Sequence, residues 1–374
     1  MSSERLRIVV AGMLAAVPRQ GGATWAALQY VLGLRRLGHE VIVVEEVEPD
    51  AYPAAVARFA MLLREFDLGP HAAIIERGDG TTAGLGRAEL LRAVAGADVL
   101  LNISGTLTDE AVLDAVRLRV FVDLDPAFTQ LWHAAESVDM GFDRHDRFVT
   151  IGREIGRPGC DVPTCERDWI TTPQPIVLDH WPLADAVVHD GLTTVGHWRA
   201  YGSIHHDGVH YGQKAHALRP LIDLPQRARA PFLLALGIHP DERDDLAALD
   251  RHGWRLLDPA AVAGTPADYR AFVQGSWAEF GLAKLGYVVS RCGWFSDRSL
   301  CYLASGRPVI AQDTGFAAWL PTGEGLFAFS TADDVAAAVD ELRSDYPRHR
   351  RGARELAESV FDSDRVLPVL LACL

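Results

Sequence analysis

The sequence has few cysteines, and no two of them have the spacing of a metal or redox site. Five cysteines occur among 374 residues, and no pair is separated by just two residues. C-x-x-C spacing is typical of zinc knuckles and dithiol redox centres, so its absence argues against both. Cys160 and Cys165 are close enough in a loop rich in proline and glycine to touch each other. An odd number of cysteines nevertheless favours reduced thiols in a cytoplasmic protein.

Positive charge and long apolar runs are also scarce. The chain carries 36 Lys and Arg against 50 Asp and Glu, a net charge of -14. Nucleic acids and anionic membranes attract basic surfaces, so this charge predicts no nucleic acid and no membrane partner. It still allows a local basic pocket for one phosphate group. No apolar run approaches the roughly 20 residues that cross a bilayer.

The N-terminal segment loosely imitates a secretory signal. Arg5 and Arg7 precede the apolar run of residues 8–17. Pro18, Arg19 and Gln20 then follow, where a signal would have a small-residue cleavage site. We therefore interpret the run as a first strand that leads into a glycine loop.

Apolar strand-like runs alternate with helical patterns along the chain. In the first half the runs are "RIVVAGM", "EVIVVEEV", "ADVLLNISG", "LRVFVDLDP" and "DRFVTIG", the last of which we expect to end this half. In the second half they are "LTTVGHW", "PFLLALG", "GWRLLD", "YVVSR" and "PVIAQD". Helical patterns in the first half cover residues 23–37, 87–95 and 109–116. Continuous Val/Ile/Leu strands alternating with helices predict parallel sheets covered on both faces.

This pattern predicts an α/β fold of two Rossmann-like parallel-sheet domains that face each other across a cleft. We expect an N-terminal acceptor-binding domain over residues 1–175 and a linker over 176–190, at the end of a proline-rich stretch of residues 157–182. A C-terminal domain would follow over 191–350, and a helical tail over 351–374 would pack back on the first domain. Loops and helix N-termini converge at the C-terminal ends of parallel strands, so the functional cleft should lie there.

The first glycine loop does not have the form of a dinucleotide fingerprint. Residues 12–22 do not spell G-x-G-x-x-G, and the loop is too long for a tight pyrophosphate turn. Glu45 and Glu46 do follow the second strand, where a ribose-binding acid would stand, but without the fingerprint a dehydrogenase is disfavoured. We expect Gly21, Gly22 and Thr24 to shape the acceptor side of the cleft.

The most informative stretch is "YVVSRCGWFSDRSLCYLASGRPVIAQDTG", residues 287–315. We predict that "YVVS" is a strand and that a turn after it leads into a helix capped by Ser296 or Ser299. The first-turn N–H groups of that helix, with Arg298 beside them, would form an anion site. The alternative is an ordinary capped helix whose Asp297 and Arg298 face solvent.

The next strand ends in a second polar cluster. Asp313 and Thr314 follow "PVIAQ" and could hydrogen-bond the hydroxyls of a polyol. Asp-Thr-Gly is also an ordinary turn sequence. An anion-binding helix and a polyol-binding strand end in adjacent units together predict a ligand that contains phosphates and a sugar.

The same residues carry a resemblance to a known family. The strings "GWFSDRSLCYLASGRPVIAQDTG" and "PTGEGLFAF" resemble the pattern GWFS-x-R-S-x-CYLA-x-GRPV-x-x-QDTG of a bacterial group of two-domain, GT-B type glycosyltransferases. The similarity extends through "VDLDPAFTQLWH" and "WAEFGLAK". It implies transfer of a sugar from a nucleoside diphosphate sugar to a small-molecule acceptor. The nucleotide sugar would be a co-substrate, and no cofactor would be needed.

The resemblance also suggests donor-binding residues. It places the diphosphate on Gly293, Trp294, Phe295, Ser296 and Arg298. A second basic group would be Arg199 or Lys214, the donor sugar would meet Asp313 and Thr314, and Glu324 would reach the ribose or the sugar.

The long loop after residue 197 is rich in histidine. His197, His205, His206 and His210 occur there with Asp207, and these are suitable metal ligands. Their spacing fits no standard zinc motif, and the resemblance implies no metal. We therefore favour a mobile loop that closes on substrate.

Transfer to a hydroxyl or amine requires a base. Asp125, Asp123 and His133 are the candidates, in that order, because "VFVDLDPAFTQLWH" combines a strand end with a helix predicted to begin at Pro126. Asp-x-Asp-Pro is also a helix-capping sequence, and a lone histidine is usually structural. A sugar-nucleotide epimerase, a glycoside phosphorylase or a non-catalytic sugar-nucleotide binding protein remain alternatives.

Overall fold

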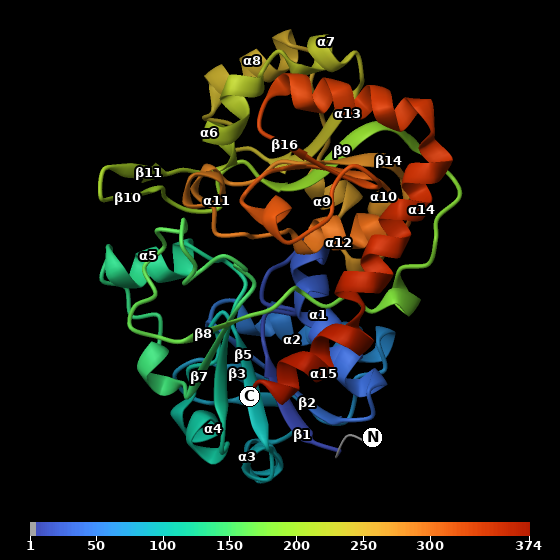
Figure 1. Cartoon of the computed structure of the whole chain (residues 1–374). Helices are drawn as coiled ribbons and strands as arrows, with labels where there is room; N and C mark the ends of the chain where they lie inside the picture. The colour runs from blue at the N-terminus through green and yellow to red at the C-terminus, as the bar shows by residue number, and fades with distance from the viewer. Residues whose placement is uncertain (1–4) are drawn as a thin grey trace.

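A computed structural model describes residues 5–374. It contains two parallel sheets, each covered by helices on both faces, with one domain above the other in the view of Figure 1. The predicted α/β fold of two facing Rossmann-like domains is therefore confirmed.

The N-terminal sheet is parallel except for the antiparallel pair β3–β4, and its strand order is β4-β3-β2-β1-β5-β6-β7-β8. Its strands are β1 (Arg7–Ala11), β2 (Glu40–Val47), β3 (Ala72–Glu76), β4 (Thr82–Gly84), β5 (Val99–Ile103), β6 (Arg119–Asp123), β7 (Arg147–Thr150) and β8 (Trp169–Thr171). Its helices are α1 (Gly21–Arg36), α2 (Tyr52–Glu65), α3 (Arg87–Ala95), α4 (Glu110–Ala115) and α5 (Phe128–Ala134), with 3-10 turns η1 (Phe142–Arg144) and η2 (Leu178–His180).

Alternation along β1 explains why this sheet is covered on both faces. Ile8 and Val10 join the core formed with α1 and α2, whereas Val9 and Ala11 join the core formed with α3 and α4. Side chains of a strand alternate between faces, so a continuous apolar run buries both.

The C-terminal sheet has the order β13-β12-β9-β14-β15-β16, and all of its pairs are parallel. Its strands are β9 (His189–His197), β12 (Phe232–Gly237), β13 (Arg255–Leu256), β14 (Ser276–Gly281), β15 (Val309–Gln312) and β16 (Leu326–Phe329). Its helices are α6 (Lys214–Leu218), α7 (Leu224–Ala228), α8 (Arg243–Arg251), α9 (Pro259–Val262), α10 (Pro266–Gly275), α11 (Leu285–Ser290), α12 (Asp297–Ala304) and α13 (Ala332–Ser344), with 3-10 turns η3 (Arg219–Leu221) and η4 (Phe316–Ala318). The strands β10 (Ile204–His206) and β11 (Val209–Tyr211) form a separate antiparallel hairpin.

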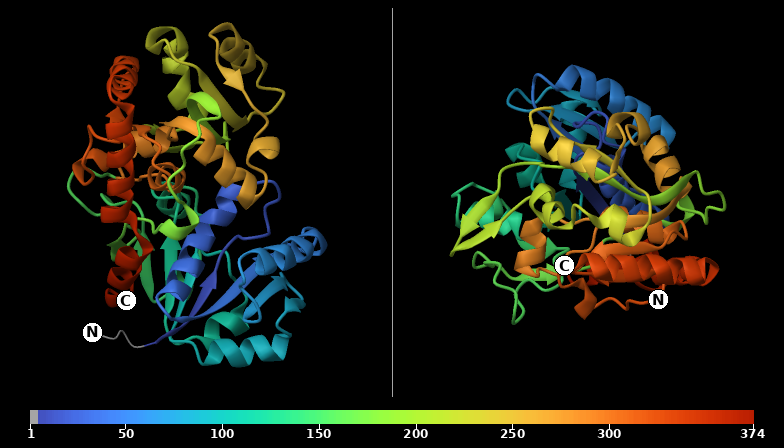
Figure 2. Two further views of the ribbon diagram at one scale, coloured as in Figure 1. Left: turned by 90° about the vertical axis from the view of Figure 1, so that its right-hand side faces the viewer. Right: turned by 90° about the horizontal axis from the view of Figure 1, so that it is seen from above.

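The last helices run from the upper domain to the lower one along one side of the molecule (Figures 1 and 2). They are α14 (Tyr346–Leu356), the π-helical turn η5 (Ala357–Phe361) and α15 (Ser363–Ala372). Helix α15 packs on α1 so closely that a Cβ added at Gly33 would lie 2.5 Å from Cδ1 of Leu367. The chain thus returns to its N-terminal domain.

Several predicted elements differ from the structure. Residues 287–290 belong to helix α11, and the strand of this unit is β14, which precedes them. A short apolar run such as residues 287–290 fits a strand or a buried helix equally well. Strand β14 was missed because it contains an acidic residue, Glu279, which interrupts its apolar pattern. Strand β7 is not the last of its sheet, because β8 lies within the proline-rich stretch. Helix α5 begins at Phe128 rather than at Pro126, since Ala127 has φ +70° and breaks the helix.

One face of the C-terminal sheet shares a continuous core with the N-terminal domain. Helices α10 and α12 bury Tyr269 and Leu300 in the same cluster as Trp25 of α1. The contact is close at the start of α1, where Gly21 donates its N–H to the carbonyl of Ala263 at 3.0 Å. Trp25 Nε1 donates to the carbonyl of Pro266 at 2.9 Å. These contacts join the two domains directly.

This close approach predicts that Gly21→Ala is destabilising. The new Cβ would lie 2.1 Å from the carbonyl oxygen of Thr265, which is backbone and cannot move alone. Overpacking of this kind costs about 1–3 kcal/mol. Gly202→Ala is the matched control, because nothing lies within 4 Å of an added Cβ there. Urea denaturation should show a lower free energy of unfolding for Gly21→Ala only. Equal losses of unfolding free energy in the two variants would contradict the close contact at Gly21.

Candidate active site

Two cavities lie where the strand order of each sheet reverses. The reversal falls between β1 and β5 in the first sheet and between β9 and β14 in the second. Ligands of open α/β sheets bind outside the carboxyl ends of strands at such points. The large cavity, about 400 Å³, is lined by the start of α1, the end of β9 and the start of α12. The small cavity, about 240 Å³, is lined by α1, the ends of β5 and β6, Gln174 and Asp297.

Two predicted donor-binding cations meet at the large cavity. A Cβ added at Gly196, which lines this cavity, would lie 3.7 Å from Lys214 Cε and 3.9 Å from Arg298 Nη1. Gly196 is at the C-terminal end of β9, Lys214 begins α6, and Arg298 is in the first turn of α12. The absence of a side chain at Gly196 therefore leaves space beside both cations.

Arg298 is buried and already has one anionic partner. Its Nε donates to Oε1 of Glu279 at 2.5 Å, and its Nη1 donates to the carbonyl of Val195 at 3.0 Å. Burial, the largest effect, lowers the pKa of Arg298, but the charge and hydrogen bond of Glu279 together with the charges of Tyr269 and Tyr302 offset it and leave the pKa raised. Within residues 5–374, Nη2 has no hydrogen-bond partner. Nε and Nη1 of the guanidinium are thus held within the fold, whereas Nη2 is buried without a partner among the described residues.

Lys214 is a buried cation without an anionic partner in the described part of the chain. Burial, followed by the charges of Arg298 and Lys284, lowers its pKa to about 7. The charged form of a buried amine is costly unless an anion is close. An anionic ligand in the large cavity would therefore stabilise the protonated form.

The other residues predicted to bind a diphosphate line neither cavity. Gly293 has φ +74° and packs against Glu154 of the N-terminal domain. Trp294 stacks on Tyr287 at 4.3 Å, and Phe295 is buried in the shared core. Ser296 caps α12 by accepting the N–H of Arg298 at 3.2 Å, which confirms the predicted cap.

Four more predicted residues are distant from these cavities or already paired. Arg199 forms an ion pair with Glu242 and lines neither cavity. Asp313 accepts the N–H of Gly315 at 2.9 Å, and Thr314 donates to the carbonyl of Trp294, so both organise a turn. Glu324 is exposed, precedes β16 at the N-terminal end of that strand, and pairs with Arg348 at 3.2 Å. The C-terminal strand ends form the cleft, so Glu324 lies at the opposite edge of the sheet.

Two of the three proposed bases are structural by position. Asp123 is fully buried and accepts hydrogen bonds from Thr129, Gln130 and Thr150 at 2.7–2.9 Å. His133 packs on Phe142, with ring centroids 4.7 Å apart, and lines neither cavity. Asp123 therefore shapes the end of β6, and His133 lies outside the cleft.

Asp125 lines the small cavity, but its carboxylate is engaged by the other domain. Lys284 Nζ lies 2.9 and 3.0 Å from its two oxygens, and Tyr201 donates to it at 2.6 Å. Tyr287 is a third donor. Burial and the Asp125 charge raise the pKa of Tyr201 and Tyr287 well above the usual range, so both hydroxyls stay protonated. We call these four residues the interdomain clasp.

The glycine loop and the acids after β2 also have definite positions. Gly22 lines the large cavity, while Thr24 is buried and donates to the carbonyl of Leu14 at 2.8 Å. Glu45 accepts the N–H groups of residues 14–16 at 2.7–2.9 Å and so holds this loop. Burial raises the pKa of Glu45 to about 7, against the effect of these bonds. Glu45 is thus a loop support that touches neither cavity.

The histidine-rich loop forms the β10–β11 hairpin, which packs beside α5 of the N-terminal domain. His205 Nε2 and His210 Nδ1 lie 2.8 Å apart. Among residues 5–374, no three His, Cys, Asp or Glu side chains are grouped so as to hold a metal ion. Over the same residues, no helix has the length and apolar character to cross a membrane.

Glu279, Asp297, Lys284 and Tyr201 were not among the predicted site residues. An acid within the strand "SWAEFG" was the available signal for Glu279, because a charge in a buried strand requires a partner. Nothing in the sequence pairs Lys284 and Tyr201 with Asp125, since their contact arises only when the domains meet.

Searches for similar proteins returned structures but no sequence families. No protein-family profile matches the chain, and no curated protein sequence matches it. An α-glucosyltransferase in complex with UDP-glucose and DNA containing an abasic site is 12% identical, covers 99% of each chain and has a TM-score of 0.63. The HepE protein of Anabaena, in complex with UDP and glucose, is 12% identical, covers 99% of this chain and 100% of the other, and has a TM-score of 0.57. AviGT4, a glycosyltransferase involved in avilamycin A biosynthesis, is 14% identical, and the match covers 98% of this chain and 96% of the AviGT4 chain with a TM-score of 0.56. The fold is therefore the GT-B fold of these glycosyltransferases.

These structures correct one expectation. The net charge of -14 led us to predict no nucleic acid partner. That prediction is wrong, because the net charge does not exclude such a partner. Proteins of the same fold bind DNA, including an α-glucosyltransferase with UDP and a 13-mer DNA containing a HMU base. Net charge sums over the whole surface, whereas a partner meets one face, so the total is not a ground for excluding DNA.

The buried pair of Arg298 and Glu279 predicts a large cost when one partner loses its charge. Glu279→Gln should lower the free energy of unfolding by about 3–5 kcal/mol, because Arg298 would be left buried without a counter-charge. Glu324→Gln is the control, since it breaks an exposed Glu–Arg pair whose charges are screened by solvent. Urea denaturation of both variants measures the difference. Similar losses of unfolding free energy in the two variants would show that burial does not determine how much the Glu279–Arg298 pair contributes to stability.

Proposed function

We propose that the chain is a glycosyltransferase that binds a nucleoside diphosphate sugar in the large cavity. The observation that carries the proposal is the approach of Lys214 Cε and Arg298 Nη1 to Gly196, a residue that lines the large cavity at the reversal point of the C-terminal sheet. Two cations beside the N-terminus of α12 suit a diphosphate. Three solved structures of the same fold contain UDP or UDP-glucose, which makes the uridine nucleotide the first candidate.

The proposed site suits the charges that glycosyl transfer generates. The sugar carbon gains positive character as its bond to the diphosphate breaks, and the leaving diphosphate gains negative charge. Lys214 and Arg298 would stabilise that leaving group, and because both cations are buried, each charge counts for more than in solution. A cavity of about 400 Å³ lies within the range of small-molecule sites.

The resemblance of residues 293–315 to the GWFS-x-R-S group supports the same proposal. Of the residues it suggested, Arg298 and Lys214 are the two at the large cavity, so these would carry the donor contact. The alternative of a sugar-nucleotide binding protein without catalysis predicts the same donor contact and differs only in turnover.

The proposal predicts that UDP stabilises the protein through Lys214. At about 100 times its dissociation constant, UDP should add about 2.7 kcal/mol to stability, which a thermal-shift assay detects easily. Lys214→Met should abolish most of this gain. Arg199→Met is the control, because that cation faces Glu242 and should leave the UDP effect intact. If neither UDP nor the other nucleoside diphosphates shift the melting temperature of the wild type, the proposed function fails.

The lowered pKa of Lys214 predicts that UDP binding takes up a proton. In the free protein the amine titrates near pH 7, and a bound diphosphate raises that pKa by favouring the charged form. Above pH 7 the amine must therefore gain a proton on binding, so affinity should fall as pH rises from 7 to 9.

Calorimetry at pH 8 in two buffers of different ionisation enthalpy measures this proton uptake. Wild type should take up a substantial fraction of one proton more than Lys214→Met. The phosphates of UDP are common to both proteins. Burial and then the charge of Lys214 lower the pKa of His197, so both proteins are compared in a His197→Gln background, where the difference isolates Lys214. Equal uptake in the two proteins would contradict the assignment.

A further inference from the structure

The small cavity is built from one face of α1 and the reversal point of the N-terminal sheet. Ala23, Ala26 and Ala27 are spaced i, i+3, i+4 and so lie on one helix face. Opposite them are Ser104 and Leu124, which follow β5 and β6. The walls are mostly apolar, with Ser104, Gln174 and two carboxylates as polar groups.

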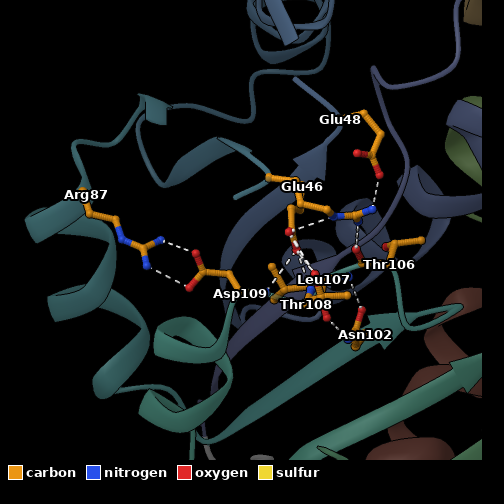
Figure 3. Close-up of polar contacts among 9 residues, drawn as sticks. Glu46, Glu48, Arg87, Asn102, Thr106, Leu107, Thr108 and Asp109 are labelled. Carbon is orange, nitrogen blue, oxygen red and sulfur yellow. Dashed lines mark hydrogen bonds and ion pairs between the residues drawn. The ribbon is translucent and has the colours of Figure 1, made fainter. Parts of the chain in front are cut away.

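Ser104 has a strained backbone that its surroundings maintain. Its φ of +56° lies in the left-handed region, which costs a residue other than glycine roughly 1–3 kcal/mol. The segment after it is fixed by Glu46, which accepts the N–H groups of Thr108 and Asp109 (Figure 3). Asn102 binds both the N–H and the carbonyl of Leu107 at 3.1 and 2.9 Å. Strain held in this way is typical of functional positions.

Asp297 is the carboxylate left free between the two cavities. It lines both of them, as does Ala23 of α1. Its only side-chain hydrogen bond in the described chain is the one that it accepts from the Ser296 hydroxyl at 3.4 Å, and it forms no ion pair within residues 5–374. Asp125, the other carboxylate of the small cavity, is occupied by the interdomain clasp. A carboxylate on the border of both cavities can reach an acceptor on one side and the donor sugar on the other.

We infer that the small cavity is the acceptor pocket and that Asp297 takes the proton of the reacting hydroxyl. The inference deepens the proposed function and rests on it. The acceptor oxygen forms a bond to the sugar carbon, and the bond between that carbon and the diphosphate oxygen breaks. The bonding pair leaves with the nucleoside diphosphate, and the hydroxyl proton passes to Asp297.

The walls of the pocket indicate the class of acceptor. Three alanines, Leu124 and Ile103 suit an apolar surface, and Ser104 and Gln174 supply hydrogen bonds at its margin. The volume of about 240 Å³ is below the roughly 300–1,000 Å³ of pockets for drug-sized ligands. The acceptor is therefore an alcohol whose hydroxyl is attached to a compact apolar group.

The first experiment uses benzyl alcohol as the probe and UDP-glucose as the donor. UDP release is followed with and without the alcohol, and benzyl glucoside is detected by mass spectrometry. In wild type, the alcohol should raise UDP release above the rate with water alone. If the wild type binds UDP but the alcohol has no effect, the acceptor class is wrong and the proposed function stands. If DNA raises UDP release and benzyl alcohol does not, the inference is overturned in favour of a nucleic acid acceptor.

A pocket-filling variant tests the location. Ala26→Phe should abolish the acceleration by benzyl alcohol while UDP binds with an unchanged Kd, because Ala26 lines only the small cavity. Ala57→Phe, at an exposed position of α2, controls for the introduction of phenylalanine into a helix. Undiminished acceleration in Ala26→Phe would place the acceptor elsewhere.

The role of Asp297 is tested by charge removal and rescue. Asp297→Asn should lower transfer about 10²–10⁴-fold, the usual contribution of a general base. It should bind UDP at least as tightly, because a negative charge beside the diphosphate is removed. Formate should restore part of the activity of Asp297→Ala, which a merely structural aspartate would not allow. Wild-type transfer by Asp297→Asn, or absence of rescue with UDP binding intact, would overturn this role.

Discussion

The close approach of α1 to the C-terminal domain determines where everything else in the cleft can lie. The start of this helix has no room for a side chain at Gly21, and Trp25 is anchored to the carbonyl of Pro266. Because α1 begins at the cleft and continues into the N-terminal core, its first turns line both cavities. A shift of this one contact would alter the two cavities together. The distance between the proposed donor and acceptor pockets therefore depends on backbone packing.

Charge burial is the second constraint, and it acts unequally on the two cations. Arg298 is stabilised by Glu279 before any ligand arrives, so its cost of burial is largely met within the fold. Lys214 has no such partner, and burial brings its pKa to about 7. One cation is thus permanently charged and fixed, whereas the other gains its full charge when an anion binds. The proposed site therefore has one charge that is always present and one charge that depends on the ligand.

The fold was predictable because its signals are local. The bounds of β2 and α3 agree with the predicted runs, since a buried parallel strand and a capped helix are visible in the residues themselves. The prediction of a strand at residues 287–290 failed because three apolar residues do not distinguish a strand from a helix. Strand β4 and strand β8 have three residues each, too few to show alternation.

The site was only partly predictable, because its residues are brought together by tertiary contacts. Helix capping by Ser296 is local and was expected, while the placement of Lys214 beside Arg298 depends on β9 and β14 being neighbours in the sheet. The pairing of Arg298 with Glu279 depends on the packing of α12 against β14. Asp125 was chosen for its position at a strand end, and that position also faces the other domain, where Lys284 occupies it.

The cleft thus divides its charged groups into two sets. One set, Asp125 with Lys284 and Glu279 with Arg298, is neutralised internally and holds the structure together. The other set consists of Lys214, which forms no ion pair within residues 5–374, and the carboxylate of Asp297, which lines both cavities. In the proposed reaction the leaving group gains negative charge and the acceptor loses a proton. The unpaired cation Lys214 begins α6 of the C-terminal domain, and the unpaired acid Asp297 lies between the cavities. Lys214 is therefore opposite in sign to the proposed leaving group, and Asp297 is opposite in sign to the proton that it would accept.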